Sequence, residues 1–409
     1  MTRLKTADIQ PSSLDFLVEF GKALHRYGAP AHRIESAVTH VAKTIDVQCQ
    51  IKSSPTSITV GIGPRTDQEI FFERIEPGSI NLAKLRELDL LSTQIKEKGY
   101  CGVDDQLQLN DIIEKESNDS SLVQVGAFLT VSSAGAVLLG GGIYDIAVGS
   151  VIGLLTGLLS LFFKRFNAGG KLFEVVASFN AGLVAHLANR MGVPVNYYVT
   201  LLAGIIVLIP GLTLTIAMIE LSTRNLVSGT ARMMSALVVF LQMIFGVALS
   251  EKLVSTLMGP PAMQVELAPL DFWYLIAALF LGIFAVALLF KAHAKDYVFI
   301  VITAIAAFFV TNALSTDSGP AVAAAAGGLV AGLIANTVAR IYNKSALILL
   351  VPGILMLVPG SLGFKSINAF WKQDVIGGID AAFHMCVVAV SLTVGILIAN
   401  ALVSSRRSL

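Results

Sequence analysis

Two stretches with the same Pro-Gly break decide the fold, Leu208-Ile209-Pro210-Gly211-Leu212 and Leu357-Val358-Pro359-Gly360-Ser361. Each break lies in an apolar run of about 20 residues, long enough to cross a bilayer as a helix. Proline lacks the backbone N–H that a helix needs, and glycine adds backbone freedom. Within a bilayer the freed backbone groups must find partners in neighbouring helices or in a wet cavity. The two stretches therefore predict two interrupted membrane helices.

Similar residues surround the two breaks at nearly the same spacings, which indicates an internal duplication. The matching residues of the first and second copies are Gly229 and Gly378, Gly246 and Gly395, and the segments 181–190 and 331–340, which end at Arg190 and Arg340. The sequence offset between the two copies differs by one residue between the segments and the glycines, which fits a one-residue difference in the length of a loop. The alternative is chance similarity, since all apolar helices reuse Ala, Gly, Leu and Val.

The composition is that of a polytopic membrane protein. Of the 409 residues, 55% are hydrophobic and 14% are charged, and the mean hydropathy is +0.74. A soluble domain carries about 25% charged residues. The net charge of +1 gives no indication of nucleic-acid binding, and the three cysteines form neither a metal-ligand spacing nor a disulfide framework. The first residues lack the apolar core of a signal peptide, so we expect the N-terminus in the cytosol.

Residues 1–121 are polar and mixed, unlike the apolar remainder of the chain. Apolar residues recur with helical spacing from Phe16 to Leu24, and they alternate with polar residues further on, as in paired strands. The expected helices cover 15–27, 30–45, 79–98 and 104–116, and the expected strands cover 47–52, 56–62 and 69–75. We therefore predict a small α+β soluble domain over residues 1–121, packed on the cytosolic face.

From about residue 122 the chain is apolar with short breaks, and we count ten spans. They cover 122–141, 146–163, 172–189, 197–221, 229–249, 272–291, 296–314, 319–341, 345–363 and 376–402. With the N-terminus inside, the cytosolic connections and tail hold 11 Lys and Arg residues, whereas the outer loops hold 4, namely Arg190, Lys252, Lys365 and Lys372. Cytosolic loops carry such an excess. The asymmetry predicts a multi-pass protein of the cell (inner or plasma) membrane with both termini in the cytoplasm.

Spans three to five match spans eight to ten, so the repeat is five spans long. An odd number of crossings places the two copies in opposite orientations across the membrane. Inverted repeats with broken helices are typical of secondary transporters. We therefore predict an α-helical polytopic membrane protein with ten transmembrane helices in two inverted five-helix repeats, 122–250 and 268–405. A duplicated channel or membrane-embedded enzyme stays an alternative at this point.

The run Pro210-Gly211, Glu220-Leu221 and Asn225-Leu226-Val227-Ser228-Gly229-Thr230-Ala231-Arg232 resembles the signature of the threonine/serine exporter (ThrE) family. The soluble part is similar to that family at Gly28-Ala29, Arg33-Ile34-Glu35 and Ser54-Pro55-Thr56-Ser57-Ile58, and the similarity extends from about Leu14 to Leu402. The resemblance implies a cytosolic N-terminal domain, ten spans and export of small polar metabolites. Named members export threonine and serine, and some relatives are linked to dicarboxylate export. Where the family pattern often has Asp, this chain has Glu220, which keeps the carboxylate but has a different reach.

The two breaks are the expected substrate site. A half-helix that begins after a Pro-Gly break presents free N–H groups and a positive dipole end, which suit a carboxylate. Hydroxyl groups at Thr213, Thr215 and Ser361 follow the breaks and can contact a hydroxy amino acid; alternatively they bond to carbonyls of their own helices. The predicted substrate-binding residues are Pro210, Gly211, Thr213, Thr215, Pro359, Gly360 and Ser361.

Two ionisable pairs are candidates for gating or ion coupling, because ionisable groups are costly within a membrane. Glu220 is expected near the cytosolic edge, Asn225 in the following turn and Arg232 beyond it. The alternative role of the Glu220–Arg232 pair is a salt bridge that fixes this turn. Asp380 and His384 lie one helical turn apart on the last span and can exchange a proton near neutral pH. The alternative for this second pair is a solvated helix end.

We expect other polar residues to have structural roles. His186 and Asn336 occupy matching positions and are expected to form hydrogen bonds between helices. Asp145 and Asp296 each open a span, where helix N-capping explains them. Stripes of glycine on spans two and eight predict close helix packing.

The motifs of ATP-driven pumps and of common enzymes do not occur: there is no P-loop, nucleophile elbow or H-E-x-x-H pattern. We therefore expect no enzyme, no cofactor and no metal, and an ion gradient as the driving force. The sequence predicts a secondary exporter of threonine, serine or a similar small polar acid, with proton antiport. A dicarboxylate (succinate-type) exporter is the first alternative, and a membrane enzyme or sensor with a metabolite-binding cytosolic domain is the second. The expected partners are an amino acid or organic acid and the lipid bilayer, without nucleic acid, and a homo-oligomer is left open.

Overall fold

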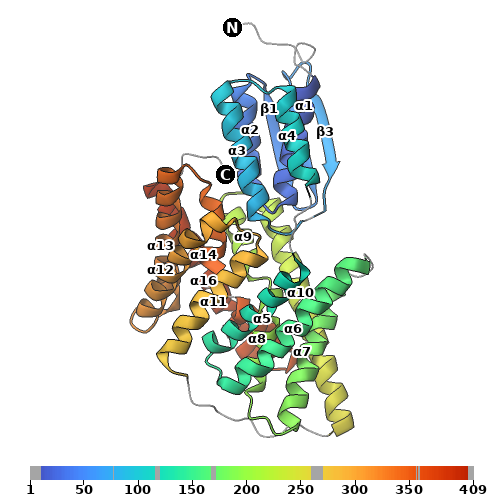
Figure 1. The fold of residues 1–409 in the computed structure, drawn as a ribbon, viewed down its shortest axis with the longest axis vertical. Coiled ribbons are helices and arrows are strands. Elements are labelled where there is room, and N and C mark those ends of the chain that lie inside the picture. The colour runs from blue at the N-terminus through green and yellow to red at the C-terminus, as the bar shows by residue number, and fades with distance from the viewer. Residues whose placement is uncertain are drawn as a thin grey trace.

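The computed structural model describes residues 11–76, 78–115, 120–166, 172–258, 270–355, 357 and 360–403. It consists of a small N-terminal domain with one three-stranded sheet and a larger bundle of helices (Figure 1). The N-terminal domain lies against one end of the bundle, which we call the near end; the opposite end is the far end.

The N-terminal domain contains the predicted helices and strands in the predicted order. The helices are α1 (Pro11–Arg26), α2 (Ala31–Thr44), α3 (Leu82–Lys98) and α4 (Val103–Glu114), and the strands are β1 (Cys49–Ser54), β2 (Ser57–Ile62) and β3 (Glu69–Arg74). Helix α3 begins later than the predicted residue 79, because the Asn81 side chain caps it by accepting a hydrogen bond from the Lys84 N–H at 3.1 Å. Strand β1 begins after Val47, whose N–H donates to the Ala42 carbonyl at the end of α2.

The sheet is an antiparallel meander in the order β1-β2-β3. Ile58, Val60 and Ile62 of β2 are buried on the face that the helices cover. They belong to one core cluster with Phe16 and Phe20 of α1, whose rings stack with centroids 5.6 Å apart. Burial of these apolar side chains provides the main favourable term for the domain.

The bundle contains the helices that the apolar runs predict. They are α5 (Ser121–Leu138), α6 (Ile143–Phe166), α7 (Phe173–Arg190), α8 (Tyr197–Ile205), η2 (Ile206–Leu208), α9 (Gly211–Ser222), α10 (Leu226–Met258), α11 (Phe272–Leu289), η3 (Ala294–Asp296), α12 (Tyr297–Ser315), α13 (Gly319–Tyr342), α14 (Ala346–Leu355), α15 (Gly360–Trp371) and α16 (Val375–Leu402).

Seven helices of the described chain are long and apolar enough to cross a membrane, namely α5, α6, α10, α11, α12 with η3, α13 and α16. Helices α14 and α15, bent by 44°, make an eighth span if they are counted as one. Helix α7 is not among these helices; it carries Glu174, His186 and Arg190. The fourth predicted span is divided into α8, η2 and α9. The chain is a multi-pass membrane protein, and ten crossings stay a prediction.

Two helix pairs in the bundle, α7–α10 and α13–α16, pack at matching glycines. A Cβ atom on Gly246 of α10 would lie 2.3 Å from the Val175 carbonyl oxygen of α7. A Cβ atom on Gly395 of α16 would lie 2.1 Å from the Ala325 carbonyl oxygen of α13. Only glycine permits so close an approach. The shift is 149 residues from Gly246 to Gly395 and 150 from Val175 to Ala325, the same register change that the sequence contains.

The glycine stripes pack closely, as the sequence predicts. On α6, a Cβ atom at Gly153 would lie 2.4 Å from the Ser132 hydroxyl oxygen of α5. On α13, a Cβ atom at Gly328 would lie 2.5 Å from the Leu392 carbonyl oxygen of α16. Both contacts lie within the apolar part of the bundle, where close helix approach favours association.

Asp145 and Asp296 are fully buried carboxylates with different partners. Asp145 is the third residue of α6 and accepts a hydrogen bond from the Gly142 N–H, before the helix, at 2.9 Å, which is the reverse of the predicted N-cap bond. It also accepts from the Asn196 N–H at 2.8 Å and from the Thr200 hydroxyl at 2.6 Å. The N-capping prediction for Asp296 is wrong: its side chain makes no cap bond, because both of its oxygens form ion pairs.

Candidate functional site

The two helix breaks meet inside the bundle. Helix α8 gives way to a 3-10 turn, Ile209 is extended, and α9 begins at Gly211 after Pro210. The second interrupted helix resumes at Gly360, the first residue of α15. A Cβ atom on Gly360 would lie 2.5 Å from the Ile209 side chain and 3.2 Å from the Gly211 Cα atom. The backbones of the two breaks are therefore in direct contact.

A cavity of about 1340 Å³ extends from the N-terminal domain to both breaks. Its lining includes most of the predicted substrate-binding residues, namely Pro210, Gly211, Thr213, Gly360 and Ser361. Thr215 is not among them, because it is buried and its hydroxyl donates to the Gly211 carbonyl at 3.3 Å. Pro359 lies outside the described residues. The structure thus brings parts of both breaks to one cavity.

The cavity changes character along its length. Near the breaks, apolar side chains of α5 and α11 such as Val131 and Val286 line it. Near the N-terminal domain the lining contains the charged residues Lys84, Glu87, Lys115, Lys164, Glu174, Arg232 and Lys291. A polar solute can therefore approach the breaks from the near end.

Glu220, at the end of α9, connects the bundle to the N-terminal domain. Its side chain is fully buried. One carboxylate oxygen accepts from the Arg232 Nε at 3.0 Å, and the other accepts from the Ala31 N–H at 2.9 Å. Ala31 is the first residue of α2, where unpaired N–H groups and the positive helix end favour a carboxylate. The predicted Glu220–Arg232 pair therefore forms, and it also holds the start of α2.

A second set of contacts lies beside this pair, at the end of β1. The Ser228 hydroxyl of α10 donates to the Ser53 carbonyl at 2.9 Å. The Ser53 N–H donates to Glu35 at 3.0 Å, and His25 Nε2 lies 2.8 Å from the Ser54 carbonyl oxygen. Burial lowers the pKa of His25 despite this hydrogen bond, and burial raises the pKa of Glu35. The β1–β2 hairpin is thus fixed to α10.

Helix α3 docks end to end on α11. The Leu82 N–H donates to the Phe290 carbonyl at 2.9 Å, and the Ala83 N–H donates to the Lys291 carbonyl at 3.0 Å. The first N–H groups of one helix thereby satisfy carbonyl groups at the end of another, all of which lack intrahelical partners. The positive N-terminal end of α3 and the negative C-terminal end of α11 also attract each other at this junction.

Asp296 is the centre of an ion-pair network at the same junction. Its carboxylate lies 3.0 Å from the Arg86 guanidinium of α3 and 2.6 Å from the Lys344 ammonium after α13. A fully buried carboxylate with two cationic partners is costly to disrupt. Sequence reasoning missed this network, since Arg86 lies in the predicted soluble domain and gave no signal of its own.

The remaining candidates lie elsewhere. Asn225 donates to Thr223 within the turn after α9. His384 Nδ1 lies 3.4 Å from the Asp380 carboxylate, but the two side chains are 47% and 70% exposed, and neither belongs to the lining of the cavity. The structure does not bring this pair to the breaks, and its role in proton exchange stays a prediction.

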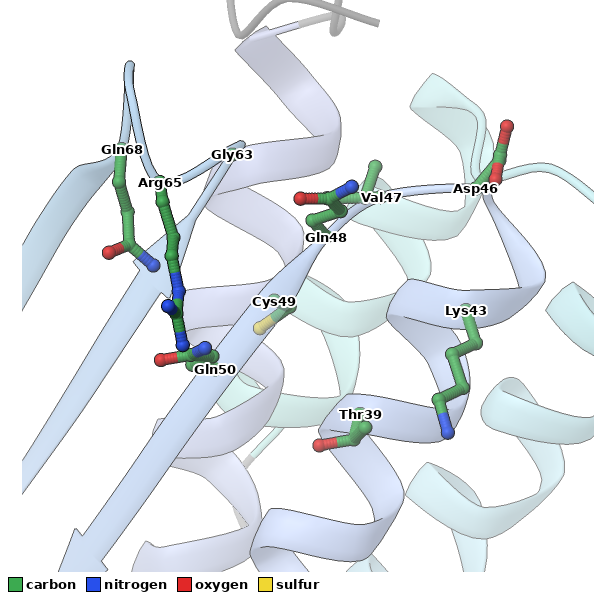
Figure 2. A pocket seen from close by; sticks show the side chains of 10 residues that line it. All are labelled: Thr39, Lys43, Asp46, Val47, Gln48, Cys49, Gln50, Gly63, Arg65 and Gln68. Atoms are coloured by element: carbon green, nitrogen blue, oxygen red, sulfur yellow. The ribbon is translucent and has the colours of Figure 1, made fainter. Parts of the chain in front are cut away.

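A smaller pocket of about 510 Å³ lies on the N-terminal domain (Figure 2). Lys43 of α2 and Arg65 of the β2–β3 loop supply its positive charges, and Arg65 extends toward Gln50 in Figure 2. Burial raises the pKa of the Cys49 thiol to about 11, so this thiol stays protonated at neutral pH. The sequence did not single out this pocket.

Comparison with known proteins covers nearly the whole chain. The model of the family described as putative threonine/serine exporter (ThrE) matches residues 15–254, and the model described as threonine/serine exporter, ThrE matches residues 275–402. The pheromone-regulated membrane protein 10 of Zygosaccharomyces rouxii is 23% identical over 93% of this chain and 42% of its own length. The protein of the same name from Eremothecium gossypii is 24% identical over 93% of this chain and 53% of its own length. The chain thus spans about half the length of these curated relatives, and no solved structure matches.

Proposed function

The chain belongs to the threonine/serine exporter (ThrE) family, and from this premise we propose that it is a secondary active exporter of small polar amino acids, threonine and serine, coupled to a proton gradient. Its family and its apolar helices make it a membrane exporter with a small-molecule substrate. The observation that carries the finer proposal is the cavity whose wall contains parts of both helix breaks.

The chemistry of this wall suits a hydroxy amino acid. In the first turn of α9 the Gly211 N–H donates to the Ile209 carbonyl at 2.7 Å, whereas the Leu212 and Thr213 N–H groups precede the intrahelical bonds and favour the substrate carboxylate. The side chains of Thr213 and Ser361 line the cavity from the two different breaks. They can exchange hydrogen bonds with the hydroxyl group of threonine or serine. We assign substrate binding to this wall.

Ten crossings in two inverted five-helix repeats complete the proposal. The matching packing of Gly246 and Gly395 supports the duplication. The positions of Asp145 and Asp296 support the inversion. Asp296 lies at the near end, where it pairs with Arg86 of α3, whereas Asp145 follows the end of α5 that is remote from the N-terminal domain. Asp145 and Asp296 open spans two and seven, which correspond in a five-span repeat, and their places at opposite ends are what an inverted repeat requires.

The near end is proposed to face the cytoplasm, in the cell membrane. The N-terminal domain contacts Glu220 at the end of α9 and Lys291 and Asp296 after α11, and Asp296 in turn pairs with Lys344 after α13. These connections carry the excess of Lys and Arg that marks cytosolic loops. The Glu220–Arg232 pair then lies at the cytosolic mouth of the cavity, where we assign it a gating role.

A dicarboxylate is the second candidate substrate. One observation favours it: the near part of the cavity is lined by more cationic than anionic side chains. A dianion would be attracted more strongly than a zwitterion to such a lining.

Purified protein in liposomes tests both candidates. We expect radiolabelled threonine to enter liposomes loaded with unlabelled threonine or serine, and we expect the Thr213→Val, Ser361→Ala double variant to lose most of this exchange. Thr230→Val is the matched control, because the Thr230 hydroxyl is exposed and donates to the Leu226 carbonyl. Exchange of succinate without threonine would establish the second candidate, and exchange of neither would reject the proposal.

A further inference from the structure

Buried polar atoms without a hydrogen-bond partner gather at the far end of α7. In the described part of the chain they include His186 Nε2, Asn189 Oδ1, Arg190 Nε and the Tyr197 hydroxyl oxygen. His186 and Asn189 are only 4% and 8% exposed. The His186 and Tyr197 rings lie 4.3 Å apart. Leaving several such atoms unpaired is costly, so the group calls for a functional reason.

The second repeat shows what lies beside His186. At the equivalent place, the Asn336 side-chain amide donates to the Asn400 side-chain oxygen at 2.8 Å, between α13 and α16. The shifts of 150 and 149 residues found for the packed helices relate Asn336 to His186 and Asn400 to Glu251. In the first repeat, a Cβ atom on Gly182 of α7, one turn before His186, would meet the side chain of Ser250 on α10, the neighbour of Glu251. The first repeat therefore has an ionisable pair where the second repeat has a neutral amide pair.

This ionisable pair is remote from the N-terminal domain. Glu251 follows Ser228 by 23 positions on the continuous helix α10, and Ser228 bonds to Ser53 of the N-terminal domain. At 1.5 Å per residue the separation is about 34 Å. The apolar core of a bilayer is about 30 Å thick. His186 and Glu251 thus lie one membrane thickness away from the Glu220–Arg232 pair.

We propose that His186 and Glu251 form the proton-binding site that couples transport to the gradient, and that protons reach it from the far face. This inference rests on the proposed function and identifies its coupling site. A proton from outside water adds to the unpartnered imidazole nitrogen and leaves a neutral water molecule behind. Release in the opposite conformation reverses this step, so each cycle carries one positive charge inward.

The surroundings of the imidazole suit such a switch. The titratable and charged groups that face it are Arg190 on α7, Tyr197 on α8, Glu251 on α10 and Lys372 after α15. Burial opposes protonation of the ring, as does the charge of Lys372, whereas the charge of Glu251 favours it. Histidine changes its charge near neutral pH, and small shifts of this balance move its proton on or off.

Proteoliposomes with the full chain separate coupling from transport. Exchange of radiolabelled threonine at equal pH measures transport, and accumulation under an interior-acid gradient measures coupling. With one proton per substrate, wild-type protein should accumulate threonine about tenfold per unit of pH. The His186→Asn, Glu251→Asn double variant, which copies the amide pair of the second repeat, should keep the exchange and lose the accumulation. His40→Asn, on α2 of the N-terminal domain, should keep both.

Two results would overturn the idea, and a third would overturn the proposed function. Gradient-driven accumulation at the wild-type level in the double variant would overturn it. If accumulation is lost in an Asp380→Asn, His384→Asn variant and not in the His186, Glu251 double variant, the coupling site lies on the last helix. Absence of threonine exchange in wild-type protein would instead reject the proposed function. If the double variant fails to fold, Glu251→Gln, which keeps the side-chain shape, decides the same question.

Discussion

The Glu220 carboxylate has partners in two parts of the chain that are far apart in sequence, Arg232 and the Ala31 N–H. Either partner alone would satisfy one oxygen. Together they make the end of α9, the start of α10 and the start of α2 depend on a single side chain. A movement of α9 during transport therefore has to break a bond to the N-terminal domain or move that domain with it.

Glu220→Gln tests this dependence. Its amide oxygen can still accept from Ala31, but Arg232 loses its counter-charge, which should lower stability by about 1–3 kcal/mol. We also expect slower threonine exchange per folded molecule, measured in liposomes after thermal unfolding has been recorded. Glu97→Gln, an exposed change on α3, serves as the control. Lower stability with unchanged exchange would reduce the pair to a salt bridge that fixes the turn.

His32 gives the N-terminal domain a pH dependence of known sign. Burial lowers its pKa to about 4 from the ordinary value of 6.5, so the folded domain binds fewer protons than the unfolded chain between these values. The stabilising effect is complete above pH 6.5 and is lost as the pH falls toward 4. Unfolding of wild-type protein should therefore become easier over this window, and His32→Gln should flatten the profile.

The effect of His32 on stability has to be separated from that of Glu35 by comparing variants. Burial raises the pKa of its carboxyl group, so Glu35 changes stability with pH in the opposite direction from His32. The difference between wild type and His32→Gln, followed by thermal melting at several pH values, isolates the histidine. An equal slope in both proteins would show that His32 does not titrate within this range.

Residue-scale reasoning from sequence found Pro210, Glu220 and Arg232 because each breaks a local rule: proline or charge in an apolar run. It did not find Ala31 or Ser53. Their contributions are backbone groups, which every residue carries, and their partners lie in the helical bundle. Such contacts depend on how two domains dock, and composition and spacing contain no signal for that.

At the scale of elements, the broken helices depend on close contact between two glycines. The Gly360 backbone reaches Gly211 only because no side chain lies between α9 and α15. Gly360→Ala would place a methyl group about 2.5 Å from Ile209. Such overpacking costs about 1–3 kcal/mol, and it would separate the two halves of the binding wall.

We therefore expect Gly360→Ala to slow threonine exchange by about tenfold or more, a 1.4 kcal/mol effect or larger. Gly126→Ala is the matched control: it lies on α5 in open space, with no atom within 4 Å of the added Cβ. Wild-type exchange in Gly360→Ala would show that the two breaks do not form one site.

The membrane helices could be predicted from the sequence, because apolar runs, Pro-Gly breaks and polar turns mark where each helix begins and ends. The division of the fourth span into α8, η2 and α9 follows from Pro210 in the same way. The number of times that the chain crosses the membrane is harder to predict. Helix α7 contains Glu174, His186 and Arg190, and its position in the bilayer depends on the partners that cover these groups.

At the scale of the whole molecule, the N-terminal domain closes the near end of the bundle by three separate junctions: Glu220 with α2, the end of α11 with α3, and Asp296 with Arg86. All three surround the charged part of the cavity. We therefore expect the N-terminal domain, as well as the membrane helices, to influence which solutes enter from the near end.

An inverted repeat makes one requirement of the whole chain that a labelling experiment can check. Met191, after α7, and Ile341, at the end of α13, are both exposed and occupy equivalent places in the two copies. With five crossings between them they must lie on opposite sides of the membrane. In a background without Cys49, Cys101 and Cys386, Met191→Cys should react with a membrane-impermeant maleimide in intact cells.

Ile341→Cys should react only after the cells are opened, and both variants should retain threonine exchange. Labelling of both positions in intact cells, or of neither, would mean an even number of crossings between the copies. The repeats would then be parallel, the two helix breaks would not offer one site to both sides in turn, and alternating access would need a different moving part.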